Sequence, residues 1–324
     1  MTILLAGPTA SGKSQLALRL AEALGEFGGA RIINADSMQV YRELRIVTAR
    51  PTPADEARVP HRLYGVLPAL EVCSAGRWRA LALAEIAAAH RDGRVPIVVG
   101  GTGMYLRVLL EGIAPVPAIP DDIRSEGRRR VEQLGDERFR AALAVRDAES
   151  AAAIKPNDLQ RLVRAGEVVE ATGVALPEWQ RRAAQTGFAD PVAKVLVMPP
   201  RERVYAQCDA RIRRMVEEGV FEEVKAFEGL QPSDDLPATR AVGMREFRTW
   251  VRGAATEEEA VAAATQATRQ YAKRQFTWFR NQTADWASFG SDIAAENGQY
   301  LERVFEEIFP FIRDFLLTHP TPPQ

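Results

Sequence analysis

Eight residues near the N-terminus, Gly7-Pro8-Thr9-Ala10-Ser11-Gly12-Lys13-Ser14, fit the pattern G-x-x-x-x-G-K-[ST]. They follow an apolar run, Ile3 to Ala6, and precede a segment from Ser14 to Leu24 in which leucine recurs every four residues. A strand, a glycine-rich turn and a helix in this order aim backbone N–H groups and the positive end of the helix at one point. The segment therefore predicts a P-loop that binds a diphosphate or a nucleotide triphosphate through residues 7–14, with Lys13 as a cation and Ser14 as a ligand of Mg²⁺.

Apolar runs bounded by glycine or proline predict further buried strands, at residues 31–35, 96–99 and 194–198. An alanine-rich helical pattern occupies residues 76–91, between the second and third of the four strands. Strands that alternate with helices indicate parallel βαβ units. We therefore expect an α/β fold, a parallel sheet like that of P-loop NTPases with helices on both faces, plus an inserted all-helical domain.

The domain boundaries follow from changes in this rhythm. Residues 1–118 are predicted to form the first part of the P-loop core. Three prolines between residues 114 and 120 introduce a stretch, 119–189, that reads as helices without a strand, and the sheet pattern resumes in 190–290, which ends in a mostly helical part. Residues 291–324 read as a tail with one helix, 300–317, and carry six acidic against two basic side chains, a net charge of −4.

Composition excludes several classes of protein. No basic leader or long apolar span precedes the P-loop, so we expect a cytoplasmic protein without a membrane segment. We also expect a monomer. Cys73 and Cys208 lie far apart and in no metal-ligand spacing, which argues against a disulfide framework or a zinc site. Outside the tail the net charge is only +3, so a preference for nucleic acid depends on local clusters of arginine rather than on bulk charge.

A single carboxylate stands out beside the predicted P-loop. The third strand ends in Gly100-Gly101-Thr102 without an acid, which makes ordinary nucleotide hydrolysis less attractive. The acid follows the second strand instead, as Asp36, and the carboxyl ends of parallel strands are where such sheets bind ligands. Asp36 has two readings, a magnesium ligand or a general base, and spacing alone slightly favours the metal role.

Several segments together resemble the bacterial tRNA dimethylallyltransferase family, also called tRNA isopentenyltransferases. In chain order they are the P-loop, Asp36-Ser37-Met38-Gln39-Val40-Tyr41-Arg42, Pro96-Ile97-Val98-Val99-Gly100-Gly101-Thr102-Gly103-Met104-Tyr105, Pro156-Asn157-Asp158-Leu159-Gln160-Arg161-Leu162-Val163-Arg164-Ala165 and Lys273-Arg274-Gln275-Phe276-Thr277-Trp278-Phe279-Arg280. The last segment is the most specific, and the match spans about residues 1–288.

The resemblance implies that the chain transfers a dimethylallyl group from dimethylallyl diphosphate to N6 of adenosine 37 in tRNA. The P-loop would hold the diphosphate with Mg²⁺, and Asp36 would be the base. Thr9, Lys13, Ser14 and Arg211 would complete the catalytic set. Positions similar to the family's tRNA contacts are Asp36, Ser37, Met38, Gln39, Thr102, Arg124, Gln160, Arg161, Leu162, Val163, Arg164, Lys273, Arg274, Gln275, Trp278 and Arg280.

The inserted helices would grip the anticodon stem through arginine–phosphate contacts. Trp278 and Phe279 have two readings, stacking on exposed bases or packing in the core. The chain departs from the family pattern at Gln207-Cys208, at Met244 and at Gly65, where the family usually has Arg-Ile, a tyrosine and an aspartate.

Three rival functions carry weight. A small-molecule kinase would share the P-loop, an isopentenyltransferase acting on free adenine nucleotides would share the donor site, and a non-catalytic RNA-binding module would share the arginines. The long helical insertion argues against the first two. The combination of Lys13, Ser14 and Asp36 argues against the third.

Overall fold

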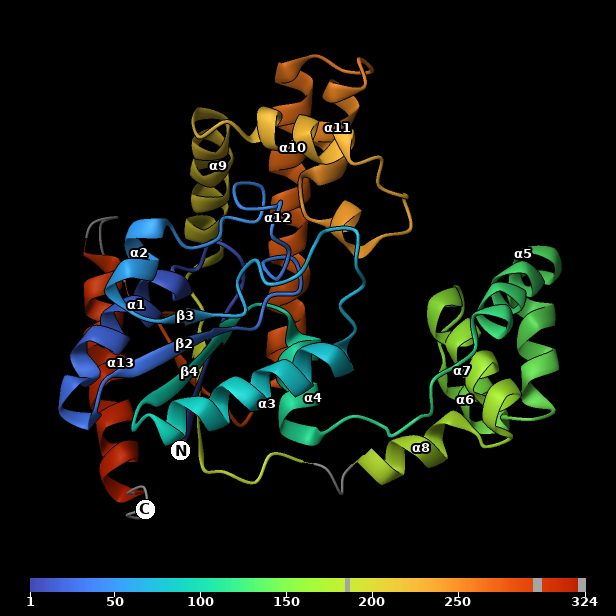
Figure 1. The fold of residues 1–324 in the computed structure, drawn as a ribbon, viewed down its shortest axis with the longest axis horizontal. Helices are drawn as coiled ribbons and strands as arrows, with labels where there is room; N and C mark the ends of the chain where they lie inside the picture. Colours follow the sequence, from blue (N-terminus) through green and yellow to red (C-terminus); the bar gives the residue numbers. More distant parts are fainter. Residues whose placement is uncertain (184–186, 294–298, 320–324) are drawn as a thin grey trace. The chain divides into compact units, whose positions relative to one another are not determined.

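The computed structural model describes residues 1–183, 187–293 and 299–319 (Figure 1). These residues form two compact units, which we call the core unit, residues 1–107 with 189–324, and the helical unit, Val108–Phe188. The first boundary falls inside one helix, α4 (Gly103–Glu111), because that helix begins on the sheet and runs into the segment that leads to the insertion.

The core unit is built on a six-stranded, all-parallel sheet in the order β3-β2-β4-β1-β5-β6. The strands are β1 (Thr2–Ala6), β2 (Ala30–Asn34), β3 (His61–Arg62), β4 (Val95–Gly100), β5 (Val192–Val197) and β6 (Ala287–Phe289). The prediction of a parallel α/β sheet is confirmed, and the four predicted strands agree with β1, β2, β4 and β5 to within one or two residues. The edge strands β3 and β6 escaped the sequence analysis because two or three residues are too few to show a pattern.

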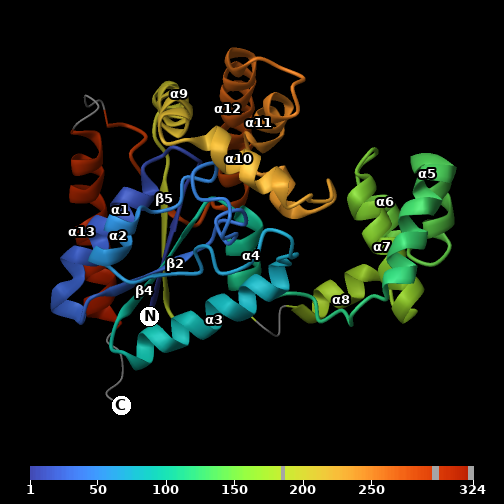
Figure 2. The same cartoon turned by 45° about the horizontal axis from the view of Figure 1, so that its top comes forward.

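Helices cover both faces of the sheet, as predicted (Figures 1 and 2). Alternate strand residues such as Ile3 and Leu5 face α1 (Lys13–Ala23) and α13 (Tyr300–Thr318), with which they form the main apolar core. On the other face lie α3 (Ala75–Arg91) and α4, whose Trp78 and Tyr105 stack with ring centroids 4.3 Å apart.

The C-terminal helix α13, which corresponds to the one helix predicted in the acidic tail, packs in this core. Its buried side chains recur every four residues and line up along one stripe of the helix, as Tyr300, Val304, Ile308, Ile312 and Leu316. All five are at most 2 % exposed, and they pack against the strands and α1. The acidic residues lie on the outer face, so the charge of the segment gave no sign of its packing.

Further helices extend the core unit beyond the sheet. They are the 3₁₀ helix η1 (Leu24–Phe27), α2 (Pro53–Arg58), α9 (Arg201–Glu217), α10 (Val220–Gly229), the 3₁₀ helix η3 (Pro237–Arg240), α11 (Met244–Val251) and α12 (Glu257–Gln282). The predicted helical stretch 204–227 divides into α9 and α10 at Gly219, whose φ of 91° no continuous helix can adopt. α12 begins with a capping box formed by Thr256 and Glu259.

The helical unit contains α5 (Asp121–Ala144), α6 (Ala148–Ala153), α7 (Leu159–Thr172) and α8 (Leu176–Ala183), and no strand among its described residues. α5 bends at Gly135, where φ is 71°. The helical unit has a small apolar core of its own, formed by Phe139, Leu143, Ala151, Leu162, Ala165 and Val169. The unit therefore has the apolar centre that an inserted domain needs.

None of the helices in the described part of the chain combines the length and the apolar character needed to cross a membrane.

The packing of α13 can be tested with one large-to-small substitution. Ile308 is fully buried against the sheet, so Ile308→Ala should lower the free energy of unfolding by about 2–5 kcal/mol, because it leaves a cavity. Leu317, on the same helix, is 60 % exposed, and Leu317→Ala should change the stability by less than about 0.5 kcal/mol. Urea unfolding of both variants measures the difference. Equal stabilities would show that α13 does not contribute to the core.

Candidate active site

The predicted P-loop connects β1 to α1, as the motif requires. Gly12 immediately precedes α1 with φ 86°, a left-handed conformation that favours glycine. The Lys13 ammonium donates to the Pro8 carbonyl, with Nζ and O 3.1 Å apart, so it lies across the loop. The Ser11 hydroxyl is buried and has no hydrogen-bond partner in the described structure. A buried hydroxyl without a partner inside such a turn fits a loop in which a phosphate oxygen is the missing acceptor.

Asp36 follows β2 at the same edge of the sheet, and the local backbone determines how its carboxylate lies. The Asn34 side chain holds the turn, since its Oδ1 accepts from the Asp36 N–H at 2.8 Å and its Nδ2 donates to the Asp36 carbonyl at 2.9 Å. Asp36 Oδ1 accepts from the Met38 N–H at 2.9 Å. The second carboxylate oxygen has no hydrogen bond within the described residues, which leaves it available to accept a proton.

A third loop, after β4, is joined to the Asp36 loop. The Ser37 N–H donates to the Thr102 hydroxyl at 3.0 Å. The register of the sheet explains the contact, because β4 lies between β1 and β2 and its end is level with both. The P-loop, the loop with Asp36 and the loop with Thr102, a predicted tRNA contact, therefore meet at one edge of the sheet.

Thr9, Asp36 and Arg211 line one cavity of about 40 Å³, so the structure brings these predicted residues together. The Arg211 guanidinium donates from Nη1 to the Thr9 hydroxyl at 3.2 Å and from Nη2 to the Thr48 carbonyl at 2.9 Å. Most of the remaining wall is apolar and comes from four different parts of the chain, as Met38, Val47, Ile212, Met215, Ala241 and Val242, together with Thr268 and Tyr271. Polar and apolar side chains in the wall of one cavity suit an amphiphilic ligand.

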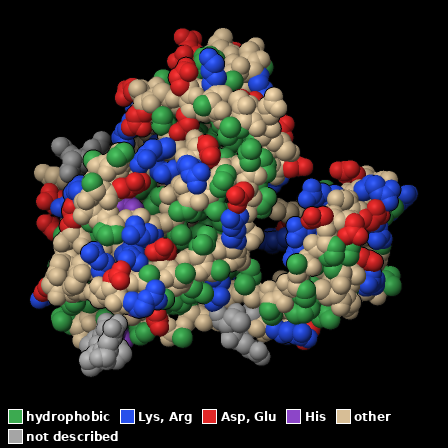
Figure 3. Space-filling view, viewed as in Figure 1, with side chains coloured by type: hydrophobic (Ala, Val, Ile, Leu, Met, Phe, Trp, Pro, Cys, Tyr) green, Lys and Arg blue, Asp and Glu red, His purple; other side chains and the backbone are tan. Residues whose placement is uncertain are grey.

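A larger, basic pocket of about 460 Å³ adjoins this cavity and shares Arg211 and Met215 with it. Its wall includes Ser14, Arg45, Arg50 and Arg214. In Figure 3, Lys and Arg side chains gather on the surface between α2 and α9. Ser14 is exposed there, at the first turn of α1, and its hydroxyl makes no hydrogen bond within the described residues.

Charged groups in the cavity, Asp36 and Arg211, interact with each other and with Lys13 of the P-loop, which does not itself line the cavity. Burial lowers the pKa of Lys13 to about 8, and the nearby Asp36 carboxylate offsets part of this effect. Burial also lowers the pKa of Arg211, again partly offset by Asp36, whereas burial and then Asp36 raise the pKa of the Tyr271 hydroxyl. Two half-buried cations thus interact with one carboxylate, an arrangement that a bound polyanion would relieve.

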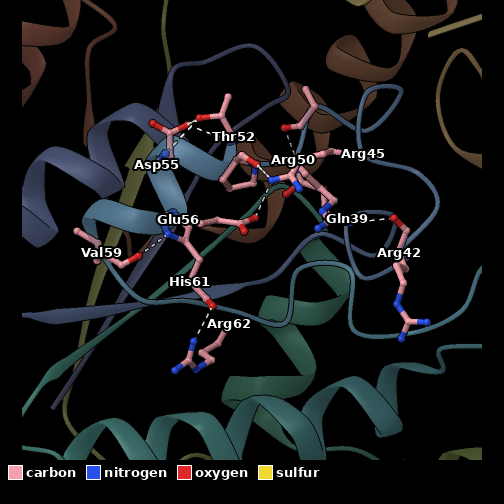
Figure 4. A network of polar contacts seen from close by, with 12 residues as sticks. Gln39, Arg42, Arg45, Arg50, Thr52, Asp55, Glu56, Val59, His61 and Arg62 are labelled. Carbon is pink, nitrogen blue, oxygen red and sulfur yellow. Dashed lines mark hydrogen bonds and ion pairs between the residues drawn. The ribbon is translucent and has the colours of Figure 1, made fainter. Parts of the chain in front are cut away.

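A network of polar contacts holds the segment 45–49, whose Val47 and Thr48 line the cavity (Figure 4). The Gln39 amide donates to the carbonyls of Thr48 and Ala49, at 2.9 and 3.1 Å. The carboxylate of Glu223 on α10 accepts the N–H groups of three consecutive residues, 45–47. Gln39, predicted to contact tRNA, therefore has a structural role in this segment as well.

The departures from the family pattern have local explanations. At Gly65 an added Cβ would lie 2.2 Å from the Arg50 guanidinium, which occupies that space and donates to the carbonyls of Tyr41 and Arg42. Cys208 and Met244 are fully buried, and Cys208 packs in an apolar cluster with Phe276. Cys208 keeps the position of the family's isoleucine apolar, whereas Gln207 carries no charge where the family usually has arginine.

The residues predicted to bind tRNA divide into exposed and buried groups. Exposed or half-buried are Ser37, Met38, Gln39, Thr102, Lys273, Arg274, Trp278 and Arg280 in the core unit and Arg124, Gln160, Arg161 and Arg164 in the helical unit. On the helical unit, Lys and Arg side chains are mixed with Asp and Glu (Figure 3). Arg124, Arg161 and Arg164 each form an ion pair with an acid three residues away.

Three of these predictions need correction. Leu162 and Val163 are 0 % and 8 % exposed, because they face the inside of the helical unit, and Gln275 is 6 % exposed. Their burial removes these side chains from the surface that an RNA could contact in this conformation. Phe279 is likewise buried, whereas Trp278 is half-buried with its ring against the backbone of Gly103.

Sequence reasoning missed Tyr271 as a wall of the cavity. Thr268, Tyr271 and Gln275 lie three and four residues apart on α12, so they share one face of the helix. That spacing was visible in the sequence, but nothing in it showed that this face is turned toward the P-loop.

Comparison with known proteins agrees with this geometry. The family model described as IPP transferase matches residues 39–282, and one described as isopentenyl transferase matches residues 1–72. A tRNA dimethylallyltransferase from Parvibaculum lavamentivorans is 48% identical over 98% of this chain and 97% of its own length. The full-length tRNA isopentenylpyrophosphate transferase from Bacillus halodurans, a crystal structure, is 30% identical, with a TM-score of 0.69 over 98% of this chain and 97% of that one.

A eukaryotic dimethylallyltransferase crystallised acting on tRNA shares the fold, with a TM-score of 0.84 over 100% of this chain and 81% of that one, at 24% identity. The first family model spans most of the chain, and the bacterial relative matches nearly all of it. This chain therefore belongs to the tRNA dimethylallyltransferase family of prenyltransferases.

Proposed function

We propose that the chain transfers a dimethylallyl group from dimethylallyl diphosphate to N6 of adenosine 37 in tRNA, and so produces N6-isopentenyladenosine and diphosphate. The observation that carries the proposal is the cavity that Thr9, Asp36 and Arg211 line together. It joins a phosphate-binding loop, an apolar wall and a carboxylate with one free oxygen. A prenyl donor and an amine acceptor need these three features.

The donor would lie with its diphosphate in the P-loop and its five carbons against the apolar wall. The cavity has room for about three water-sized groups, so the prenyl chain would fill it and extend to its mouth. Departure of diphosphate from an allylic carbon passes through a loose, cation-like transition state. Lys13, Arg211 and the N–H groups of the loop would neutralise the departing oxygens, where the charge develops.

Asp36 would act on the acceptor. As the bond between C1 of the prenyl group and the diphosphate oxygen breaks, a bond forms between C1 and N6 of the adenine. The exocyclic amine loses a proton in this step, and the free oxygen of Asp36 would take it. The apolar wall would keep water away from the cation-like carbon, which would otherwise react to give an alcohol.

The residues present also fit a magnesium ion. Mg²⁺ needs few protein ligands when it binds a diphosphate, since phosphate oxygens and water complete its shell. The Ser14 hydroxyl, which is exposed and makes no hydrogen bond to any described residue, would be such a ligand, and the metal would add positive charge beside the leaving group.

The RNA would contact both units. Exposed arginines of the helical unit and the exposed cations Lys273, Arg274 and Arg280 would contact phosphates, which positions an RNA without reading its sequence. Ser37, Met38, Gln39 and Thr102 surround Asp36 and would contact the adenine. A base stacked in the loop lies out of reach, so we expect the enzyme to extrude it. We also propose that the chain acts as a monomer in the cytoplasm.

A transfer assay tests the proposal against its rivals. With Mg²⁺ and labelled dimethylallyl diphosphate, an anticodon stem-loop carrying adenosines 36, 37 and 38 should acquire label, and the same stem-loop with guanosine at 37 should not. Labelled free AMP would indicate an enzyme for free nucleotides. Phosphorylation of a metabolite with ATP would indicate a kinase.

The role of Asp36 can be separated from its role in the turn. Asp36→Asn keeps an oxygen for the Met38 N–H but removes the base, so the transfer rate should fall by a factor of about 10²–10⁴. The dissociation constant for the stem-loop should stay the same, as measured by fluorescence anisotropy. Asp285, an exposed partner of Lys194, provides the matched control Asp285→Asn, with transfer near wild type. Undiminished transfer in Asp36→Asn would rule out the base.

The metal proposal makes a separate prediction. Chelation of Mg²⁺ should stop transfer, and Ser14→Ala should raise the Mg²⁺ concentration that gives half-maximal rate by about tenfold, because one ligand is lost. Asp285→Asn, the exposed control used above, should leave the midpoint unchanged. A Mg²⁺ titration of the initial rate measures both, and equal midpoints in Ser14→Ala and wild type would contradict the assignment.

A further inference from the structure

Gln275 of α12 connects two loops of the candidate active site. Its amide oxygen accepts the backbone N–H of Thr9, with N and Oε1 2.7 Å apart, and its amide nitrogen donates to the Gly101 carbonyl, with Nε2 and O 2.8 Å apart. Thr9 lies in the P-loop after β1, and Gly101 lies in the turn after β4. One buried side chain therefore bridges the loops at the ends of two neighbouring strands.

The two bonds demand a primary amide. One end must accept from an N–H group and the other must donate to a carbonyl, and among side chains of this length only glutamine offers both in one planar group. A glutamate would present oxygen to the Gly101 carbonyl, and a methionine would leave both backbone groups without a partner. The approach is close, since a Cβ on Gly101 would lie 2.5 Å from Gln275 Nε2.

Each end of the bridge is next to a group of the proposed reaction. The Thr9 hydroxyl accepts from Arg211 at 3.2 Å, so Thr9 is held by Gln275 through its backbone and by Arg211 through its side chain. Gly101 is followed by Thr102, whose hydroxyl accepts the Ser37 N–H beside Asp36, at 3.0 Å. Gln275 is thus linked to the proposed diphosphate site through Thr9 alone. It is linked to Asp36 through three residues, Gly101, Thr102 and Ser37.

We propose that Gln275 is a positioning residue that fixes the P-loop relative to the loop carrying Asp36. The inference rests on the proposed function, because it concerns the distance between the leaving group and the base. Gln275 itself contacts neither substrate. A displacement on the order of 1 Å between reacting groups lowers a rate by about 100-fold, so loss of the bridge should slow transfer while both binding surfaces persist.

A purely structural role predicts a different result. A residue that only filled space at this position would be apolar, since burying an amide is unfavourable unless its hydrogen bonds are made. If Gln275 served stability alone, its variants would lose folded protein, and RNA binding would fall in proportion to transfer.

The experiment compares Gln275→Glu and Gln275→Met in the full chain with wild type and with Gln270→Glu, an exposed position on the same helix. The assay uses labelled dimethylallyl diphosphate and the anticodon stem-loop, and a binding titration counts the RNA sites per chain. For both Gln275 variants we expect kcat to fall about 100-fold. We expect KM for donor and RNA to change by less than about threefold, with the number of RNA sites unchanged. Gln270→Glu should stay within about twofold of wild type.

Three outcomes would overturn the inference. A wild-type kcat in either Gln275 variant contradicts it directly. A fall in kcat that matches an equal fall in RNA sites shows that the residue only supports folding. A wild-type chain that transfers no label removes the proposed function and this inference together, whereas normal wild-type transfer with unchanged variants removes this inference alone.

Discussion

Hydrogen bonding between β1 and β4 brings Ala6 level with Gly100, and the pairing of β2 with β4 brings Asn34 level with Val99. The three strands therefore end at the same height, and the loops that leave them share one edge of the sheet. In the sheet, β4 and β2 lie on one side of β1, and β5 lies on the other side. The P-loop after β1 therefore lies where the strand order reverses, which is where open parallel sheets bind their ligands. A shift of this register by one residue would turn the buried face of β1 outward and separate the loops.

The edge of the sheet brings together two cations, Lys13 and Arg211, and one carboxylate, Asp36. Burial lowers the pKa of both Lys13 and Arg211, and Asp36 is the acid that offsets part of this effect on each of them. Such a site lowers the stability of the free protein, because its charges are only partly compensated. It raises the affinity for a polyanion, because a bound polyanion compensates them. The apolar wall next to it, with Met215 and Ile212, would favour the proposed prenyl diphosphate over a free inorganic anion, because it gives a prenyl group apolar contacts.

What the sequence could predict was local or periodic. The P-loop is contiguous, and Asp36 follows an apolar strand whose direction is fixed by the alternation of strands and helices, so both were found. The cavity wall was not found, because Val47, Met215, Val242 and Tyr271 come from segments that only tertiary packing brings together. The same limit explains Leu162, which shares a helix with the exposed Arg161 but faces the other way. A family motif marks a segment, whereas burial decides which of its side chains can touch a substrate.

The helix α12 shows how one segment can serve two purposes. Thr268, Tyr271 and Gln275 form its inward stripe, and they reach the cavity and the P-loop. Lys273, Arg274 and Arg280 are exposed on the rest of its surface, where a polyanion could contact them. Because a helix rotates by about 100° per residue, residues that neighbour each other in sequence point in different directions while sharing one rigid backbone. A cation on α12 that met an RNA phosphate would thus be joined through that backbone to the amide that holds Thr9. Contact with the RNA and alignment of the donor would then depend on the position of a single helix.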